Sequence, residues 1–295
     1  MADQSPYFPP QTKIVGATGG AKVLLHVTGR SGAGKTHLGH QLLHDPDLGP
    51  DRILFLMAED GSATYGEGAH VVQVETFFEA QARIKELIHA ARSGKVLPPV
   101  LFIDSITGLA DGQQQMRRRE PLTEWSDKRN AYVENKQAQF GELGTSFIDT
   151  VIDARNKLPM DVMMMSTTWT PKATPKNPNP LPEYAVEGNM IPKHITRLST
   201  CTLFLQPEAN EYAWPLVKQL LDSGTLRQPH RFIDELPDPD KATDETKVMI
   251  VSRFFYTQDT GEVLTKGHRN LKMKERAHLP DVLRKIKGAA APKGE

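Results

Sequence analysis

The chain has 295 residues, 36 basic and 36 acidic side chains, and a single cysteine, Cys201. This length suits one large domain or two small ones with a sizeable core, and the zero net charge supplies no overall attraction to nucleic acid or membrane. One cysteine excludes an internal disulfide and a cysteine-based zinc site. No apolar run approaches the roughly 18 residues of a membrane span, and the N-terminus lacks a signal-peptide pattern, so we expect a cytoplasmic protein.

Short apolar runs alternate with segments of helical periodicity from residue 21 onward. Residues 1–20, with their scattered glycines and prolines, are expected to be a flexible lead-in. We expect strands at 21–29, 52–60, 99–105, 161–168 and 247–256, and amphipathic helices at 77–92 and 140–158. Apolar strands separated by helices are typical of a parallel sheet covered on both faces. The sequence therefore predicts an α/β fold with a doubly wound, mostly parallel sheet and helices on both faces.

Three stretches interrupt this alternation, and we expect them to be loop insertions at about 111–139, 171–192 and 207–246. The second has five prolines within residues 171–182, which disfavours regular structure. The third is acidic and contains prolines at 234–245. With these insertions, the core is expected to span 21–258, and residues 259–295 are expected to form a basic C-terminal tail.

A glycine-rich turn follows the first strand and leads into a helix. It matches the pattern G-x4-G-K-[ST] and comprises Gly29, Arg30, Ser31, Gly32, Ala33, Gly34, Lys35, Thr36 and His37. Glycines allow backbone N–H groups to turn inward, and the helix dipole adds positive potential, so the turn can hold phosphate groups. In such a turn Lys35 reaches the β- and γ-phosphates and the Thr36 hydroxyl ligates Mg²⁺. The pattern predicts a nucleoside triphosphate site, and the absence of a guanine-reading motif favours ATP.

An acidic residue ends the strand at 99–105. Asp104 follows four apolar residues, at the carboxyl end of a strand where open α/β sheets bind their ligands. We expect Asp104 to hold the magnesium ion of the nucleotide, although an aspartate that merely caps a strand would give the same pattern.

Several segments resemble the RecA-type ATPases, and among these the compact nucleotide-binding ATPases of bacteriophages. The resemblance covers about residues 21–256 and includes AEDGSATYGEG after the second strand, LFIDSITGL, VMMMSTTWT, EGNMIPKHITRLSTCTLFL and TKVMIVSRFFY. It implies a RecA-like core that binds ATP and Mg²⁺ and hydrolyses ATP. It also implies that Glu59 is the catalytic base, and that Arg253 is an arginine finger that acts on a neighbouring subunit's nucleotide in a homo-oligomer.

Two positions depart from the family pattern. Thr167 and Thr168 stand where the family has a longer polar side chain as phosphate sensor, so the coupling between hydrolysis and the following loop is in doubt. The late strand carries Arg253, with Lys247 further back, where RecA has paired lysines.

Basic and aromatic residues occur in the segments that resemble the DNA-facing loops of the family. The candidates for contact with single-stranded DNA are Arg117, Arg118, Arg119 and Trp169, with Trp125, Lys128, Arg129, Tyr132, Lys172 and Lys176 nearby. Cations can bind the phosphates of a single strand while aromatic rings stack on its bases. Charged runs are more often solvated surface, so this prediction depends mainly on the resemblance.

The functional hypothesis is an ATPase that acts on single-stranded DNA in phage-type recombination, repair or replication. An oligomeric, ATP-driven switch or assembly factor that needs no DNA is the alternative. A small-molecule kinase fits less well, because it would need an arginine-bearing lid whereas the candidate lids are proline-rich or acidic, and because Glu59 favours water as the acceptor. His37, His40 and His44 share a helical face, but we interpret them as polar helix surface rather than as a metal site.

Overall fold

The computed structural model describes residues 22–58, 65, 68–170, 172–175, 183–185, 190–223, 238, 241–257 and 265–288. The predicted lead-in at 1–20, the predicted base Glu59 and Lys176 lie outside these ranges.

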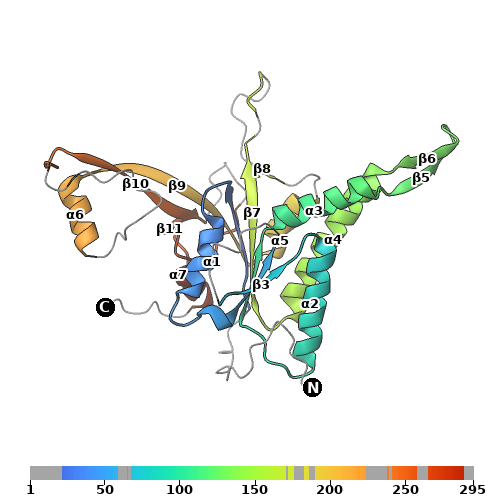
Figure 1. Ribbon diagram of the computed structural model, residues 1–295, viewed down its shortest axis with the longest axis horizontal. Helices are drawn as coiled ribbons and strands as arrows, with labels where there is room; N and C mark the ends of the chain where they lie inside the picture. Colours follow the sequence, from blue (N-terminus) through green and yellow to red (C-terminus); the bar gives the residue numbers. More distant parts are fainter. Residues whose placement is uncertain are drawn as a thin grey trace.

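Among the described residues, nine strands form one sheet in the order β11-β10-β9-β1-β7-β4-β2-β3, with β8 paired to the outer end of β7 (Figure 1). The strands are β1 (Leu24–Arg30), β2 (Ile53–Met57), β3 (His70–Gln73), β4 (Val100–Asp104), β7 (Asp161–Trp169), β8 (Glu183–Tyr184), β9 (Cys201–Ala213), β10 (Lys247–Tyr256) and β11 (Lys274–Arg276). The six strands from β9 to β3 are parallel, whereas β8, β10 and β11 are antiparallel to their neighbours. The expected α/β fold with a mostly parallel sheet is confirmed.

Helices cover both faces of this sheet. The helices α1 (Lys35–Leu43) and α7 (Leu279–Lys287) pack on one face, and α2 (Phe77–Arg92), α3 (Ile106–Arg119), α4 (Lys136–Lys157) and α5 (Met190–Leu198) pack on the other. A short 3₁₀ turn, Pro50–Arg52, precedes β2. Neighbouring residues of each central strand belong to opposite cores, since Leu25 faces α1 and Leu24 faces α5. Burial on both faces explains why the strands are continuous apolar runs.

The predicted loop insertion at 111–139 was wrong in its secondary structure. Helix α3 continues to Arg119, a hairpin of β5 (Thr123–Ser126) and β6 (Ala131–Glu134) follows, and α4 begins at Lys136. Together these elements form an arm that projects from the body of the molecule (Figure 1). The outer parts of α3 and α4 are mostly solvent-exposed, so their sequence is polar and carries no strong apolar period.

The predicted loop insertion at 207–246 is also partly regular. Strand β9 runs to Ala213 and is followed by α6 (Trp214–Asp222). β9 and β10 pair along their whole outer length, from Phe204 with Tyr256 to Ala213 with Lys247, and form a ribbon that extends beyond β1. Helix α6 packs on this ribbon through a small separate core of Trp214, Val217, Val248 and Ile250. Residues 224–237 of the insertion, and most of the insertion at 171–192, lie outside the described residues.

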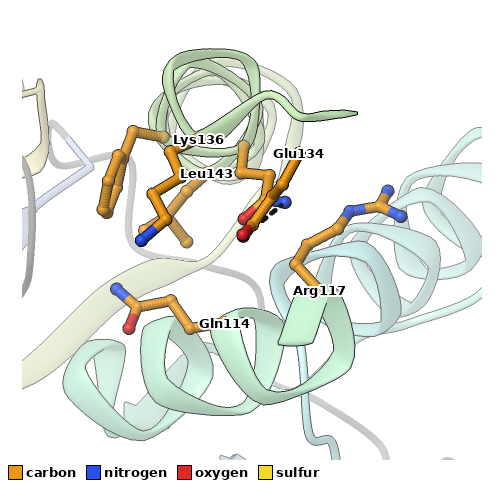
Figure 2. A pocket seen from close by; sticks show the side chains of 7 residues that line it. Gln114, Arg117, Glu134, Lys136 and Leu143 are labelled. Carbon is orange, nitrogen blue, oxygen red and sulfur yellow. Dashed lines mark hydrogen bonds between the residues drawn. The ribbon is translucent and has the colours of Figure 1, made fainter. Parts of the chain in front are cut away.

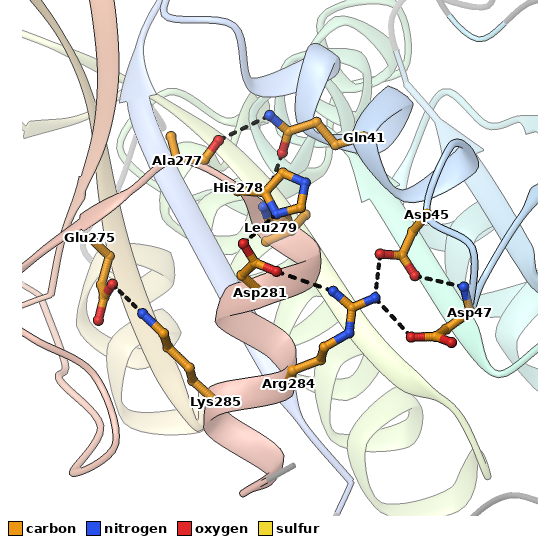
Figure 3. A network of polar contacts seen from close by, with 10 residues as sticks. All are labelled: Gln41, Asp45, Asp47, Glu275, Ala277, His278, Leu279, Asp281, Arg284 and Lys285. Atoms are coloured by element: carbon orange, nitrogen blue, oxygen red, sulfur yellow. Dashed lines mark hydrogen bonds and ion pairs between the residues drawn. The ribbon is translucent and has the colours of Figure 1, made fainter. Parts of the chain in front are cut away.

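The C-terminal segment is folded onto the body rather than being a basic tail. Its described part, residues 265–288, contains β11 and α7, and α7 buries Leu279, Val282, Leu283 and Ile286 beside α1. Several of its cations are paired with acidic residues, as Figure 3 shows for Arg284 and Lys285. The prediction of a basic tail at 259–295 was wrong for residues 265–288, where the apolar positions of α7 occur within a basic sequence.

Within the ranges that the structure describes, no helix has both the length and the apolar character needed to cross a membrane.

Candidate functional site

The glycine-rich turn joins the carboxyl end of β1 to the N-terminus of α1, as predicted. Gly32 and Gly34 adopt positive φ angles of 75° and 94°, which favour glycine. Gly34 is the N-cap of α1 and has no side chain with which to cap the helix. No side chain of the N-cap residue therefore accepts hydrogen bonds from the first N–H groups of α1. These N–H groups can donate to the oxygens of a phosphate.

Lys35 follows this cap and folds back over the turn. Its buried side chain donates from Nζ to the carbonyl oxygens of Gly29 and Arg30, each at 3.0 Å. The Ala33 N–H also donates to the Arg30 carbonyl, at 3.1 Å. Thr36 lies in the first turn of α1 and is partly buried. The ammonium group is thus held at the centre of the loop that would surround a phosphate.

Arg253 lies on the turn of its own chain. A Cβ atom at Gly34 would lie 2.4 Å from Arg253 Cζ, 2.5 Å from Nη2 and 2.7 Å from Nε. The guanidinium group therefore lies against Gly34, where the positive φ angle of 94° favours glycine. The resemblance implied an action of Arg253 on a neighbouring subunit, whereas in this structure the group reaches the turn from β10 of the same chain.

Asp104 lies at the same edge of the sheet as the turn. The registers of β4, β7 and β1 pair Ile103 with Met164 and His26 with Met164, so Asp104 is one residue further along, level with Val27. Its neighbour Ile103 belongs to the core on the α2–α5 face, so the alternation of side chains along a strand directs Asp104 toward the α1 face. The next residue, Ser105, caps α3 by accepting a hydrogen bond from the Gly108 N–H at 3.0 Å.

Tyr65 is a part of this site that the sequence analysis missed. Its hydroxyl donates to Asp104 Oδ2 at 3.2 Å, and its ring stacks on Phe55. Burial and the neighbouring Asp104 raise the pKa of the Tyr65 phenol, so the hydroxyl stays protonated and remains a donor. A single aromatic residue within the glycine-rich stretch at 61–68 was the available sequence signal.

The sensor candidates lie beside the turn. In the register of β1 with β7, Thr167 is opposite Gly29 and Thr168 is opposite Arg30. The Thr167 N–H donates to Thr107 Oγ1 at 2.9 Å. The Thr168 hydroxyl is buried and has no hydrogen-bond partner among the described residues.

A row of buried polar residues on β1 and β7, namely His26, Thr28 and Ser166, precedes the turn and was also missed by the sequence analysis. His26 Nε2 is 2.8 Å from Ser166 Oγ, which donates to Thr28 Oγ1 at 2.9 Å. Complete burial lowers the pKa of His26 to about 3, so its imidazole is neutral. The alternation of His26 and Thr28 with Leu25 and Val27 was the sequence signal, because polar residues then share one face of an otherwise apolar strand.

The predicted nucleic-acid residues are not gathered at the turn. Arg117, Arg118 and Arg119 end α3 in the projecting arm, and Arg117 forms a bidentate pair with Glu142 on α4, with both N–O distances at 2.6 Å. This pair raises the pKa of the Arg117 guanidinium and fastens α3 to α4. Arg118 and Arg119 are exposed. Trp169 is half-exposed at the end of β7, close in sequence to Thr170, whose Oγ1 accepts from Arg30 Nη2 at 3.3 Å.

A pocket of about 120 Å³ lies in the arm between α3 and α4, remote in the chain from the glycine-rich turn (Figure 2). Polar side chains dominate its lining, which consists of Gln114, Arg117, Glu134, Lys136, Gln139, Phe140 and Leu143. Its lining comes from α3, α4 and the end of β6, and no residue of the glycine-rich turn contributes to it.

The histidines on α1 pair with one another. His40 Nε2 and His44 Nε2 are 3.0 Å apart, and the His37 ring stacks on the His40 ring. Among the described residues, no group of three or more histidine, cysteine or acidic side chains is arranged to hold a metal ion. The Mg²⁺ predicted here would be held differently, largely by phosphate oxygens and water with few protein ligands.

Comparisons with known proteins give no relative from which a role could be transferred: no protein-family model matches the chain, and no curated protein sequence matches it. The carboxyl edge of the sheet brings together a bare helix N-terminus, two cationic side chains and one buried carboxylate, and this set can bind a phosphate chain together with a divalent cation.

Proposed function

We propose that the chain binds Mg·ATP at residues 29–36 and hydrolyses it, as a RecA-like P-loop ATPase. The observation that carries this proposal is that Asp104, the last residue of β4, lies level with Val27 of β1, on the face covered by α1, whose first residue is Lys35. β1 and β7 are neighbours in the sheet, and β1 leads to α1 on one face whereas the next helix after β7, α5, packs on the other. Open α/β sheets usually bind their ligands at the carboxyl ends of such a strand pair.

The residues have distinct roles in this proposal. The N–H groups of the turn and Lys35 Nζ bind phosphate oxygens, with Lys35 exchanging its bonds to the Gly29 and Arg30 carbonyls for bonds to the ligand. Thr36 and Asp104 would hold Mg²⁺, and Tyr65 orients the Asp104 carboxylate. A bound Mg²⁺ neutralises negative charge on the phosphates. Glu59 remains the predicted base for the attacking water.

Turnover of ATP by matched variants tests this proposal. Lys35→Ala and Asp104→Asn are each expected to lower the rate of ATP hydrolysis at least about 100-fold, the order of magnitude for loss of one group that stabilises developing charge. Lys22→Ala is the control, because Lys22 is an exposed cation just before β1. Glu59→Gln is expected to keep ATP affinity while turnover falls. Equal rates for the wild type and Asp104→Asn would remove Asp104 from the site.

The tip of the projecting arm favours single-stranded DNA as a second ligand. Trp125 and Tyr132 are 52% and 72% exposed on the paired strands β5 and β6, with ring centroids 5.4 Å apart. Lys128 and Arg129 are exposed in the turn that joins the two strands. Exposed rings next to cations suit the bases and phosphates of a single strand. We therefore propose this tip, rather than Arg117, as the principal contact.

One assay separates this proposal from an ATP-driven switch that needs no DNA. A DNA-dependent ATPase of recombination, repair or replication hydrolyses ATP faster when single-stranded oligonucleotide is added, and a Trp125→Ala/Tyr132→Ala variant loses the stimulation. A switch that needs no DNA hydrolyses ATP at the same rate with and without oligonucleotide. Repeating the assay across protein concentrations reports whether turnover depends on assembly.

A further inference from the structure

We infer that Arg253 binds a phosphate of the nucleotide in its own chain, so that the arginine acts in cis. The inference rests on the proposed nucleotide site and adds to it a phosphate-binding residue from a distant strand. It starts from the contact already described, in which the Arg253 guanidinium covers Gly34 at the N-terminus of α1.

The position of Arg253 is set by contacts within one chain. The Arg253 carbonyl accepts a hydrogen bond from the Ala277 N–H at 3.0 Å. Gln41, on α1, then holds this segment, because its Nε2 donates to the Ala277 carbonyl at 2.9 Å and its Oε1 accepts from the Leu279 N–H at 3.0 Å (Figure 3). The same helix therefore fixes the backbone near Arg253 and carries the turn that the guanidinium covers.

A second contact fixes the ribbon beside the turn. A Cβ atom at Gly29 would lie 2.6 Å from the carbonyl oxygen of Leu205 on β9. β10 pairs with β9 in a register that places Arg253 opposite Pro207, two residues beyond Leu205. The β9–β10 ribbon thus contacts Gly29, the first glycine of the turn. The Arg253 side chain extends from the same ribbon to Gly34, the last glycine of the turn.

The electrostatics of this place indicate an anion as ligand. Three positive features converge there: the N-terminus of α1, the Lys35 ammonium group and the Arg253 guanidinium group. A cation at the positive end of a helix is unfavourable, whereas an anion at that end is stabilised. The planar guanidinium fork matches two phosphate oxygens, a geometry that the single ammonium of lysine does not supply.

Nucleotide affinity and turnover of Arg253 variants test the contact. Arg253→Ala is expected to weaken ATP binding by about 10-fold or more, since a hydrogen bond to a charged group contributes about 1.5–3 kcal/mol, and to lower turnover by about 100-fold. Arg253→Lys should recover part of both losses. Arg276→Ala is the control, because this exposed arginine is paired with Phe254 on the neighbouring strand. Circular dichroism checks that each variant is folded.

Mixing two inactive variants distinguishes action in cis from action in trans. Lys35→Ala keeps Arg253, and Arg253→Ala keeps an intact turn, so an arginine that acts in trans restores activity in a mixture of the two. Action in cis predicts that the mixture is no more active than the sum of its parts. Restored activity would overturn the inference and leave the nucleotide site in place, as would wild-type affinity and turnover in Arg253→Ala. A wild-type chain that neither binds nor hydrolyses ATP would instead overturn the proposed function, and the inference with it.

Discussion

Two basic regions of this molecule look alike in sequence and differ in structure. In the C-terminal segment, residues 265–288, the cations of α7 form ion pairs within the chain: Arg284 binds Asp45, Asp47 and Asp281, Lys285 binds Glu275, and Lys287 binds Asp161. At the tip of the arm, Lys128 and Arg129 are exposed beside two exposed rings. The difference teaches that a charge run identifies a binding surface only when the fold leaves its cations facing solvent.

The largest expected effect is the loss of stability when the internal network is broken. Arg284 is 16% exposed, and its Nη2 lies 2.5 Å from Oδ2 of Asp45, whose side chain is 3% exposed. Arg284→Met would leave a buried carboxylate without its cation, and we expect the free energy of unfolding to fall by about 3 kcal/mol. Arg269→Met, at an exposed arginine of the same segment, should change it by less than about 0.5 kcal/mol.

Urea denaturation of both variants measures these changes. If Arg284→Met is as stable as Arg269→Met, the network of Figure 3 does not hold α7 against α1.

A smaller effect is expected at the tip of the arm, on binding rather than on stability. The Trp125→Ala/Tyr132→Ala variant loses two stacking surfaces, and its affinity for single-stranded DNA is expected to fall about 10-fold, since stacking contributes about 1–3 kcal/mol per base. Both rings are exposed and lie against each other, and the Trp125 indole N–H donates to the exposed Asp127, so the free energy of unfolding should change little. Fluorescence anisotropy of a labelled oligonucleotide measures the affinity, and unchanged affinity would exclude the tip as the contact.

Replacing cations in each of the two basic regions tests whether only those at the tip of the arm contact DNA phosphates. Lys128→Gln/Arg129→Gln should reduce the slope of log affinity against log salt by about 1.4, because each phosphate contact on a single strand contributes about 0.7. Lys285→Gln, in the C-terminal segment, should leave this slope unchanged because Lys285 is already paired with Glu275 at 2.6 Å. Equal slopes for the two variants would mean that the tip does not contact phosphates.

The smallest expected effect is on the pH dependence of stability, through the carboxyl group of Glu275 in the C-terminal segment. Burial opposes the ionisation of Glu275, but hydrogen bonds from Lys285 Nζ and the Lys272 N–H outweigh it, and the pKa of the carboxyl falls below its ordinary value. A carboxyl with a lower pKa in the folded state stabilises the fold above its ordinary pKa of about 4.3. This stabilisation is lost as the pH falls through the lowered pKa.

Thermal unfolding of the wild type and Glu275→Gln across pH 3–7, about the range in which glutamate titrates, tests this dependence. The wild type should be the more stable chain near neutral pH, and the difference should shrink in acid. A difference that stays constant with pH would show that the charge of Glu275 does not matter.

The parts of the fold that follow from short-range patterns were predictable. The strand at 247–256 and the helix at 77–92 have the expected bounds, because continuous apolar runs and a clear amphipathic period determine them locally. The glycine-rich turn was predictable for the same reason. Asp104 could be predicted at the edge of the sheet because the carboxyl ends of parallel strands meet there.

The remaining features depend on contacts between residues far apart in the chain. Arg117 looked available for DNA until its pairing with Glu142, on a different helix, was known. Arg253 reaches Gly34 only because β10 returns antiparallel beside β9 and Ala277 is tied to Gln41. No local pattern near residue 253 contains that information, so the approach of this arginine to its own turn could not be inferred from the sequence.

Calorimetric titration of ATP in the presence of Mg²⁺ measures whether the turn at residues 29–36 binds a nucleotide. We expect saturable, Mg²⁺-dependent binding to the wild-type chain with one ATP per chain. The affinity of Lys35→Ala should be at least about 10-fold weaker, because this variant loses a charge-assisted contact to phosphate. The control Lys22→Ala should bind like the wild type. Wild-type binding that is undetectable at millimolar ATP, or equal affinities for the wild type and Lys35→Ala, would contradict the claim that the turn at residues 29–36 holds a nucleotide.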